Sequence, residues 1–235
     1  MIKTLNENMS VKGLDLNTIN TLYHEFFIRG DYDWWRPVQP GDIVVDVGAN
    51  IGMFTCLALD RGAKKVYAIE PNLELLKTTI ENASLHIVDK KETPLIPINC
   101  AISSREDLVT SIHGSMTDQK LKIKSFKEIL DTYNIDKIDF LKIDCEGGEY
   151  DILNTENLEF IKKNVRHIAV EVHLDFHKEG PAKFIEFRDN FLSHFNTVRF
   201  LEPRGAELTY KSRENEAWPI GWDGCWMIYI CNHNI

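Results

Sequence analysis

The segment IVVDVGANIGMFT, residues 43–55, joins an apolar run to one acid and two glycines. Asp46 ends the apolar run. A strand buried on both faces is expected to be apolar throughout, so a carboxylate at its carboxyl end favours a ligand-binding role. Gly48 and Gly52 permit a tight turn into a helix whose N–H groups attract an anionic group. These residue types predict a loop that binds a nucleotide-like cofactor.

A second acid lies where a ribose-binding residue is expected. Glu70, in the segment VYAIEPN, follows the first glycine of the loop by about 20 residues, which is the spacing typical of nucleotide-binding folds. The loop and the acid together indicate a cofactor that carries a nucleoside. Asn72 has two readings at this stage, as part of the same site or as the cap of the next helix.

The loop favours S-adenosylmethionine over a dinucleotide. A dinucleotide loop needs the pattern G-x-G-x-x-G, whereas this chain places Asn50 between Gly48 and Gly52. Asp46 would repel a diphosphate but would attract an ammonium group. S-adenosylmethionine has that ammonium group, a carboxylate for the backbone N–H groups and a ribose for Glu70.

A second group of charged residues lies in LKIDCEGGEYDIL. Lys142, Asp144 and Glu146 alternate with apolar residues, so they share one face for as long as the strand continues. Glu149 then falls in the first turn of a helix, where it serves either as a cap or as part of the site. Several charges at the end of one strand make a poor core and a plausible active site.

The segment AVEVH repeats this arrangement, with Glu171 and His173 on one face of the next strand. In the first of two interpretations, His173 or Asp144 accepts a proton from the substrate hydroxyl, and positioning supplies most of the acceleration. In the second, Asp144, Glu171 and His173 bind a divalent ion that lowers the pKa of the hydroxyl. The ion ranks second because the spacing is not diagnostic of a metal site.

Strand and helix patterns alternate along the chain and predict the elements that position these residues. The expected strands are 43–47, 65–69, 93–102 (near an edge, because of its prolines), 137–144, 166–173, 197–202 and 225–231; the expected helices are 19–27, 53–59, 73–83, 125–133, 147–163 and 180–195, with a loop or small hairpin over 103–124. This order predicts an α/β fold with a mainly parallel twisted sheet and helices on both faces. Ligands bind such sheets at the carboxyl ends of the strands.

Length and composition favour one soluble globular domain. Of the 235 residues, we expect 1–40 to form an N-terminal helical extension packed on a single domain at 41–235. The net charge of -9 argues against a broad nucleic-acid surface. Five cysteines without C-x-x-C spacing argue against a disulfide framework or a zinc site, and no apolar run suits a membrane, so a cytoplasmic location is expected.

The motifs VVDVGANIGMFT, AIEPN, NCAIS, FLKIDCEGGEYDIL and VEVH, in this order over residues 43–173, resemble those of the FkbM-type S-adenosylmethionine-dependent methyltransferases. The resemblance implies a Rossmann-like class I methyltransferase fold. It also implies methylation of a hydroxyl on a sugar or another small metabolite. By this resemblance the glycine loop lines the methionine end of the cofactor, and residues 99–102 lie near the adenine.

The residues expected at the site follow from both lines of argument. The candidates for cofactor binding are Asp46, Gly48, Asn50, Gly52, Glu70, Asn72, Ala101 and Asp144. The candidates for catalysis are Lys142, Asp144, Glu146, Glu149 and His173. Two alternatives remain open, an NAD-dependent oxidoreductase and a catalytically silent protein that binds S-adenosylmethionine.

The tryptophans and the irregular segment 103–124 each have a structural and a functional interpretation. Trp34, Trp35, Trp218, Trp222 and Trp226 are expected mainly in the core, with stacking on a sugar or base as the alternative. Ser115 and Met116 would form a lid over the cofactor or pack within their loop. Acceptor specificity is expected in residues 1–40, in 103–124 and in the Trp-rich tail.

Overall fold

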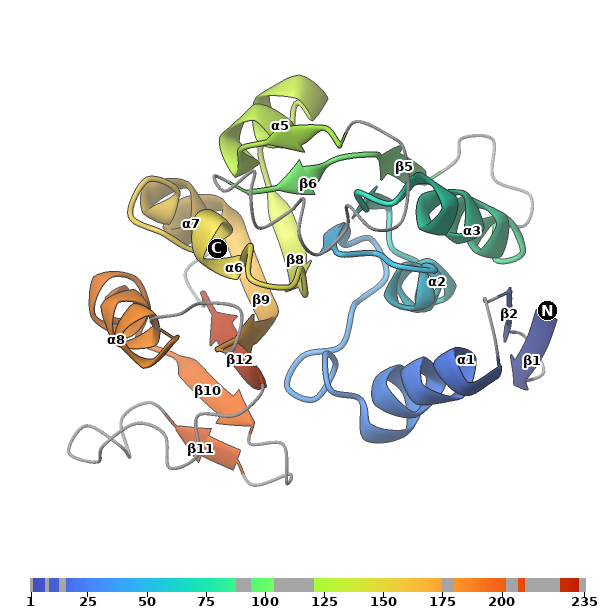
Figure 1. Ribbon diagram of the computed structural model, residues 1–235, viewed down its shortest axis with the longest axis horizontal. Coiled ribbons are helices and arrows are strands. Elements are labelled where there is room, and N and C mark those ends of the chain that lie inside the picture. Colours follow the sequence, from blue (N-terminus) through green and yellow to red (C-terminus); the bar gives the residue numbers. More distant parts are fainter. Residues whose placement is uncertain are drawn as a thin grey trace. The chain divides into compact units, whose positions relative to one another are not determined.

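The computed structural model describes residues 2–6, 9–12, 16–87, 94–103, 121–174, 180–201, 207–209 and 225–232 (Figure 1). The described residues fall into two compact units. The first contains the residues up to 101 together with 121 and 122, and the second contains 102, 103 and the residues from 123 onward. The predicted lid residues Ser115 and Met116, as well as Trp218 and Trp222, lie outside the described part of the chain.

The first unit has a parallel sheet at its centre. Strands β3 (Ile43–Val47), β4 (Lys65–Ile69) and β5 (Leu95–Ile98) pair in that order. The first two were predicted with these bounds, because a strand buried on both faces is a short apolar run. β5 lies at the sheet edge, as its prolines predicted, since a proline cannot donate to a ladder on both sides.

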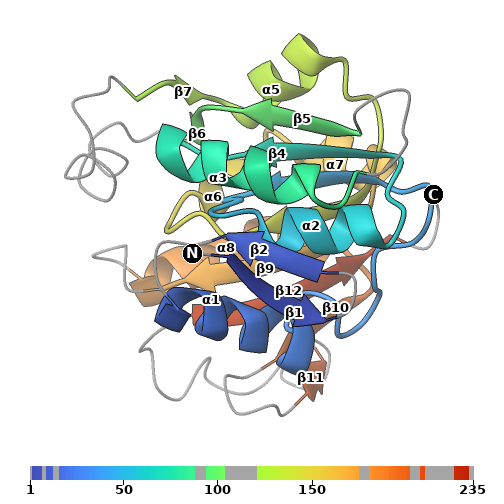
Figure 2. The same ribbon diagram turned by 90° about the vertical axis from the view of Figure 1, so that its right-hand side faces the viewer.

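Two predicted helices flank these strands. In α2 (Met53–Asp60) every residue from Met53 to Leu59 is buried, whereas α3 (Leu73–Ser84) is buried on one face only. The two helices pack against each other (Figure 2). The carbonyl of Ala58 accepts a hydrogen bond from Ala63 N, and the chain then enters β4.

The residues before β3 contain more than the predicted helix. Strands β1 (Ile2–Asn6) and β2 (Met9–Lys12) form an antiparallel hairpin that the sequence analysis did not predict. The helix α1 (Leu16–Tyr23) continues into a π-helical turn at His24–Arg29 and ends at Gly30, whose φ of 66° is left-handed. The ring of Phe26 stacks on that of Tyr32, and Tyr32 makes a tilted ring contact with Phe54 of α2, which attaches this segment to the rest of the first unit.

The second unit has a mixed sheet in the order β8, β9, β12, β10, β11 (Figure 1). These strands are β8 (Ile138–Ile143), β9 (Val165–His173), β12 (Cys225–Cys231), β10 (Val198–Leu201) and β11 (Glu207–Thr209). β8 and β9 are parallel. β12 is antiparallel to both of its neighbours, so β9 and β10 run in the same direction on either side of it.

The helices of the second unit are shorter than predicted in two places. α5 (Phe126–Tyr133) begins at a capping box of Ser125 and Glu128, as predicted. The helical region expected over 147–163 is two helices, α6 (Glu149–Ile152) and α7 (Leu158–Asn164). α8 (Gly180–Asn190) gives way to a 3-10 turn at Leu192–His194.

The short strands β6 (Ala101–Ile102) and β7 (Ile123–Lys124) pair with each other; β6 precedes the segment 103–124 that was expected to be a loop or small hairpin, and β7 is its last two residues. Trp226 is buried in β12, as predicted for a core residue, whereas Trp34 is exposed. Within the described part of the chain, no helix has the length and apolar character that crossing a bilayer requires.

Candidate active site

The glycine loop between β3 and α2 has the tight geometry that its sequence predicted. Gly48 N and Ala49 N both donate to the carbonyl of Ile69, at 2.9 and 3.0 Å, which ties the loop to the end of β4. At Gly52 the φ of 83° is left-handed. A Cβ there would lie 2.8 Å from Cγ2 and 3.0 Å from Cα of Thr79. The position therefore requires glycine for its conformation and for the close approach of α3.

Asp46 is completely buried at the end of β3. Its Oδ2 accepts a hydrogen bond of 2.6 Å from the hydroxyl of Thr55, in the first turn of α2. A carboxylate buried in this way needs hydrogen bonds to offset the loss of hydration. Asp46 thus connects the strand to the helix across the glycine loop.

Glu70 connects two loops through its carboxylate. Its Oε2 accepts from Asn50 N and its Oε1 accepts from Asn72 N, both at 2.9 Å. Asn99, which follows β5, donates its Nδ2 to the carbonyls of Glu70 and Pro71 at 3.0 and 2.9 Å. The loops after β3, β4 and β5 are therefore linked to one another. A carboxylate oxygen has two lone pairs and can accept more than one hydrogen bond, so the chemistry of Glu70 is compatible with ligand hydroxyls as donors.

Asn72 is the N-cap of α3. Its side-chain oxygen accepts from Glu74 N at 2.9 Å and from Leu75 N at 3.2 Å. This is the capping alternative of the two readings that the sequence left open. Ala101 lies in β6 and is buried, with its N–H donating to the carbonyl of Lys122 at 2.8 Å.

Two buried polar residues of α3 support the glycine loop and were missed from the sequence. Thr79 Oγ1 donates to the carbonyl of Asn50 at 2.6 Å, and Asn82 Nδ2 donates to the carbonyl of Ile51 at 2.7 Å. Both side chains are fully buried. The available signal was a pair of polar residues three apart on the apolar face of a helix, where packing alone would favour leucine or valine.

The second group of predicted site residues begins where β8 ends. Lys142 is 2% exposed, and its Nζ lies 3.7 Å from Oδ2 of Asp144. The sequence placed Glu146 on the same face only for as long as the strand continues; β8 ends at Ile143, and Glu146 lies beyond it with a left-handed φ of 55°. A turn through Gly147, whose φ is 99°, positions these residues instead of the strand pleat.

Glu149 closes this turn from the start of α6. Its Oε1 accepts from Cys145 N and Gly147 N, both at 3.2 Å, and lies 2.8 Å from Nδ1 of His173. The side chain is 1% exposed. Glu149 therefore holds both the backbone of the turn and the imidazole at the end of β9, a pairing that the sequence did not reveal.

His173 lies among carboxylates. Its Nε2 is 3.6 Å from Oε2 of Glu146 and 4.0 Å from both Oδ1 of Asp144 and Oε1 of Glu171. Burial lowers the pKa of His173, but the hydrogen bond and charge of Glu149, with the charges of Asp144 and Glu171, outweigh burial and raise the pKa from 6.5 to about 9. The structure thus brings together all the residues predicted at the ends of β8 and β9.

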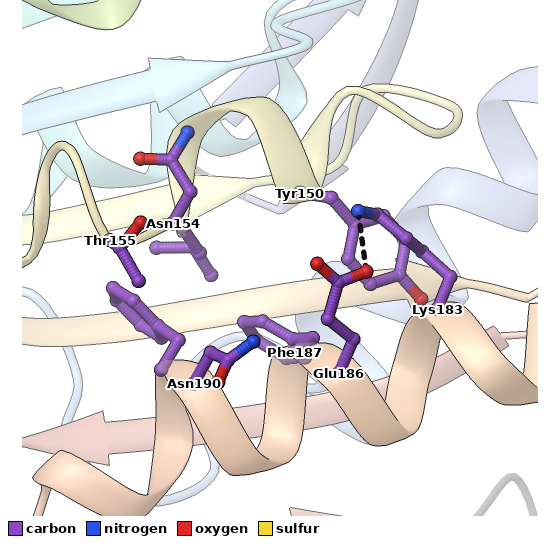
Figure 3. A pocket seen from close by; sticks show the side chains of 9 residues that line it. Tyr150, Asn154, Thr155, Lys183, Glu186, Phe187 and Asn190 are labelled. Atoms are coloured by element: carbon purple, nitrogen blue, oxygen red, sulfur yellow. Dashed lines mark hydrogen bonds and ion pairs between the residues drawn. The ribbon is translucent and has the colours of Figure 1, made fainter.

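A separate pocket lies between α6 and α8 of the second unit (Figure 3). The aromatic rings of Tyr150 and Phe187 line it and meet edge to face, with centroids 5.5 Å apart. Lys183 and Glu186 of α8 also line it and form an ion pair of 3.0 Å. With a cavity volume of about 90 Å³, this pocket is smaller than the pockets of roughly 300 Å³ or more that hold small organic ligands.

The fold defines the class of this protein. Parallel strands with helices between them carry the glycine loop after one strand and an acid after the next, which is the Rossmann-like arrangement of class I methyltransferases. An FkbM methyltransferase from Methylobacillus flagellatus KT has a similar structure, with a TM-score of 0.52 and 16% identity over 88% of this chain and 47% of that chain. A putative methyltransferase of Escherichia coli, yhhF, gives a TM-score of 0.49 and 14% identity over 98% of each chain.

The chain belongs to the FkbM methyltransferase family. The family described as Methyltransferase FkbM domain matches residues 46–198, which confirms the resemblance inferred from the motifs. The chain is also similar to the AMB antimetabolite synthetase AmbE of Pseudomonas aeruginosa, with 24% identity over 213 residues and 69% of this chain. It spans 10% of the length of that relative.

Proposed function

We propose that this protein transfers the methyl group of S-adenosylmethionine to a hydroxyl of a small acceptor, with a saccharide as the first class to test. The observation that carries the proposal is the linked set of loops after β3, β4 and β5. Glu70 binds the backbone of the glycine loop and of the next turn, at 2.9 Å each, and Asn99 joins the third loop to them. Class I methyltransferases bind their cofactor on loops in these positions.

The chemistry of the loop residues fits this cofactor. A Cβ at position 52 would collide with Thr79 of α3, so glycine there lets α3 support the loop in its left-handed conformation. In the proposal the N–H groups of residues 48–52 bind the cofactor carboxylate, the negative charge of Asp46 favours its ammonium group, and Glu70 accepts from the ribose hydroxyls. Asn99 and Ala101 lie beside the adenine. The bound cofactor supplies an electrophilic methyl group.

The acceptor side of the proposal uses the cluster at the ends of β8 and β9. A general base must be unprotonated at the working pH. With a pKa of about 9, the imidazole of His173 is charged near neutral pH and cannot accept a proton there. Asp144 therefore takes the role of base in this proposal. Lys142, Glu146 and Glu149 shape the charge around it, and His173 donates a hydrogen bond to the acceptor.

Two observations bear on the nature of the acceptor. One protein similar to this chain, AmbE, is named as an antimetabolite synthetase, which supports a small-molecule acceptor in this proposal. The negative net charge of -9 also favours a small acceptor over RNA or DNA. Hydroxylated small molecules, sugars first, are therefore the acceptors to screen.

Calorimetric titration tests the proposal. S-adenosylmethionine and NAD are titrated separately into the metal-stripped full chain and into its Asp46→Ala and Asp144→Ala variants. Saturable binding of S-adenosylmethionine alone, weakened about tenfold or more by Asp46→Ala and less by Asp144→Ala, is expected. Binding of NAD alone would support the oxidoreductase. Binding of S-adenosylmethionine without turnover on any hydroxylated acceptor would support the silent binding protein.

A further inference from the structure

We propose that Asp144, Glu146 and His173 form a binding site for a divalent cation of intermediate hardness, such as Mn²⁺. Each residue offers one ligand atom, and these atoms lie within 4.8 Å of one another. The set differs from the one expected from the sequence, because the left-handed turn at Glu146 brings that carboxylate toward the imidazole. Glu171 lies next to the three ligands.

The distances at Nε2 of His173 suit a shared cation better than direct bonds. The 3.6 Å to Glu146 and the 4.0 Å to Asp144 exceed the length of a hydrogen bond between nitrogen and oxygen. Two ligand atoms that each lie about 2.1 Å from one ion are separated by roughly 3 to 4 Å. A cation can therefore sit between these groups with little movement of the side chains.

Glu149 supplies a second, independent observation. This carboxylate is 1% exposed and holds Nδ1 of His173 at 2.8 Å, which leaves Nε2 turned toward Asp144 and Glu146. A carboxylate on the far nitrogen of an imidazole is the arrangement that orients metal-binding histidines. Among the described residues, the other oxygen of Glu149, Oε2, is buried without a hydrogen-bond partner. A metal ion on Nε2 would keep positive charge beside this buried carboxylate when the imidazole gives up its proton to bind the ion.

The charges around His173 also favour a bound cation. Four carboxylates surround the imidazole, those of Asp144, Glu146, Glu149 and Glu171, and Lys142 adds one ammonium group. Negative charge is therefore in excess even when both nitrogenous groups are cationic. A divalent cation would neutralise this excess and would be the largest local charge.

The ligand set indicates the kind of ion. Carboxylates suit Mg²⁺, Ca²⁺ and Mn²⁺, whereas an imidazole suits the transition metals, so the mixture favours Mn²⁺. The side chains of Asp144 and Glu146 are 26% and 45% exposed, which leaves room for water or an acceptor oxygen on the ion. If the proposed function holds, the ion would lower the pKa of the acceptor hydroxyl and would replace the hydrogen bond from His173, because Nε2 of His173 would then bind the ion. Binding of the ion itself does not depend on that function.

Mn²⁺ alone is the probe for the test. The metal-stripped full chain is titrated with Mn²⁺, without cofactor or acceptor, and free Mn²⁺ is measured by electron paramagnetic resonance. We expect one saturable site, with binding weakened about tenfold or more in Glu146→Gln, His173→Gln and Glu149→Gln. Pulsed measurements should show coupling to a histidine nitrogen in the wild type, and this coupling should be absent in His173→Gln.

Glu159→Gln is the matched control. Glu159 is an exposed carboxylate of the same unit, paired with Lys163 at 2.9 Å. Removal of its negative charge should leave Mn²⁺ binding unchanged. Glu146 is partly exposed, so the Glu146→Gln variant should fold, which circular dichroism verifies. The proposal is overturned if folded wild-type protein shows no saturable Mn²⁺ binding, or if Glu146→Gln binds Mn²⁺ as tightly as the wild type. Either result leaves the binding of S-adenosylmethionine to be judged separately.

Discussion

His173 shows how much one residue depends on its neighbours. In the metal-free protein, Glu149, Asp144 and Glu171 raise its pKa to about 9, although burial opposes them, and Glu146 lies 3.6 Å from the same ring. Because this pKa lies above the ordinary value of 6.5, the charged imidazole stabilises the fold fully below about pH 6.5. The contribution is then lost as the pH rises through about 9.

We therefore expect the unfolding free energy of the metal-free protein to fall between pH 6.5 and 9.5, by an amount on the order of 3 kcal/mol. The His173→Gln variant should lack this part of the pH dependence. Chemical denaturation at several pH values measures the difference, and nuclear magnetic resonance of the imidazole gives the pKa directly. An imidazole that titrates near 6.5 in the folded, metal-free protein would contradict the prediction.

Glu70 has a structural and a proposed functional role at once. Both of its carboxylate oxygens accept backbone N–H groups, from Asn50 and Asn72, and an amide at this position can accept only one of them. Glu70→Gln should destabilise the protein by about 1 to 3 kcal/mol and weaken S-adenosylmethionine binding about tenfold. Denaturation and calorimetry measure the two effects. Glu74→Gln, on an exposed ion pair with Lys77, is the control, and equal cofactor affinity in Glu70→Gln and wild type would refute the ribose assignment.

At the scale of the elements, Asn72 acts as the N-cap of α3, although the sequence also predicted it as a site residue. Asn72→Ala removes the side-chain oxygen that accepts from Glu74 N and Leu75 N, so we expect a loss of about 1 kcal/mol in stability. Asn72→Ser should recover most of it, since serine also caps helices. Thermal denaturation measures both variants. A large loss of cofactor affinity in Asn72→Ser, despite restored stability, would instead assign Asn72 a role in binding.

The packing of α3 against the glycine loop predicts different losses of stability for two glycine substitutions. Gly52→Ala combines the strain of a left-handed φ of 83° with a Cβ only 2.8 Å from Thr79. Gly41→Ala isolates the strain, because Gly41 has a φ of 89° and nothing lies within 4 Å of its added Cβ. We expect a loss of about 1 to 2 kcal/mol for Gly41→Ala and a clearly larger loss for Gly52→Ala, by denaturant titration. Equal losses would show that the close approach of α3 is unimportant.

The sequence predicted the elements best where local signals were strong. The bounds of β3 and β4 followed from apolar runs, and the start of α5 followed from the Ser125 and Glu128 capping box. The hairpin of β1 and β2 and the early end of β8 were not predicted, because neither depends on periodicity alone. In the same way, the candidate residues could be named, but the pairing of Glu149 with His173 depends on two segments that meet only in the fold.

At the scale of the whole molecule, residues 41–235 were expected to form a single domain, whereas the described residues form two compact units. Calorimetry can show whether these units unfold together. We predict one calorimetric unfolding transition. S-adenosylmethionine at about 100 times its Kd should shift the entire transition, by a stabilisation of about 2.7 kcal/mol. NAD at the same concentration is the control. Two separate transitions, only one of which responds to S-adenosylmethionine, would show that the units unfold independently.

The position of β12 has a consequence for synthesis on the ribosome. β12 pairs with β9 on one side and β10 on the other, although residues 225–231 are translated well after both. Until this strand emerges, the nascent chain exposes two unpaired strand edges, one of them along the apolar β9. Such edges invite pairing with other chains. Polypeptides truncated before Cys225 should therefore depend on chaperones to a degree that the completed sheet does not.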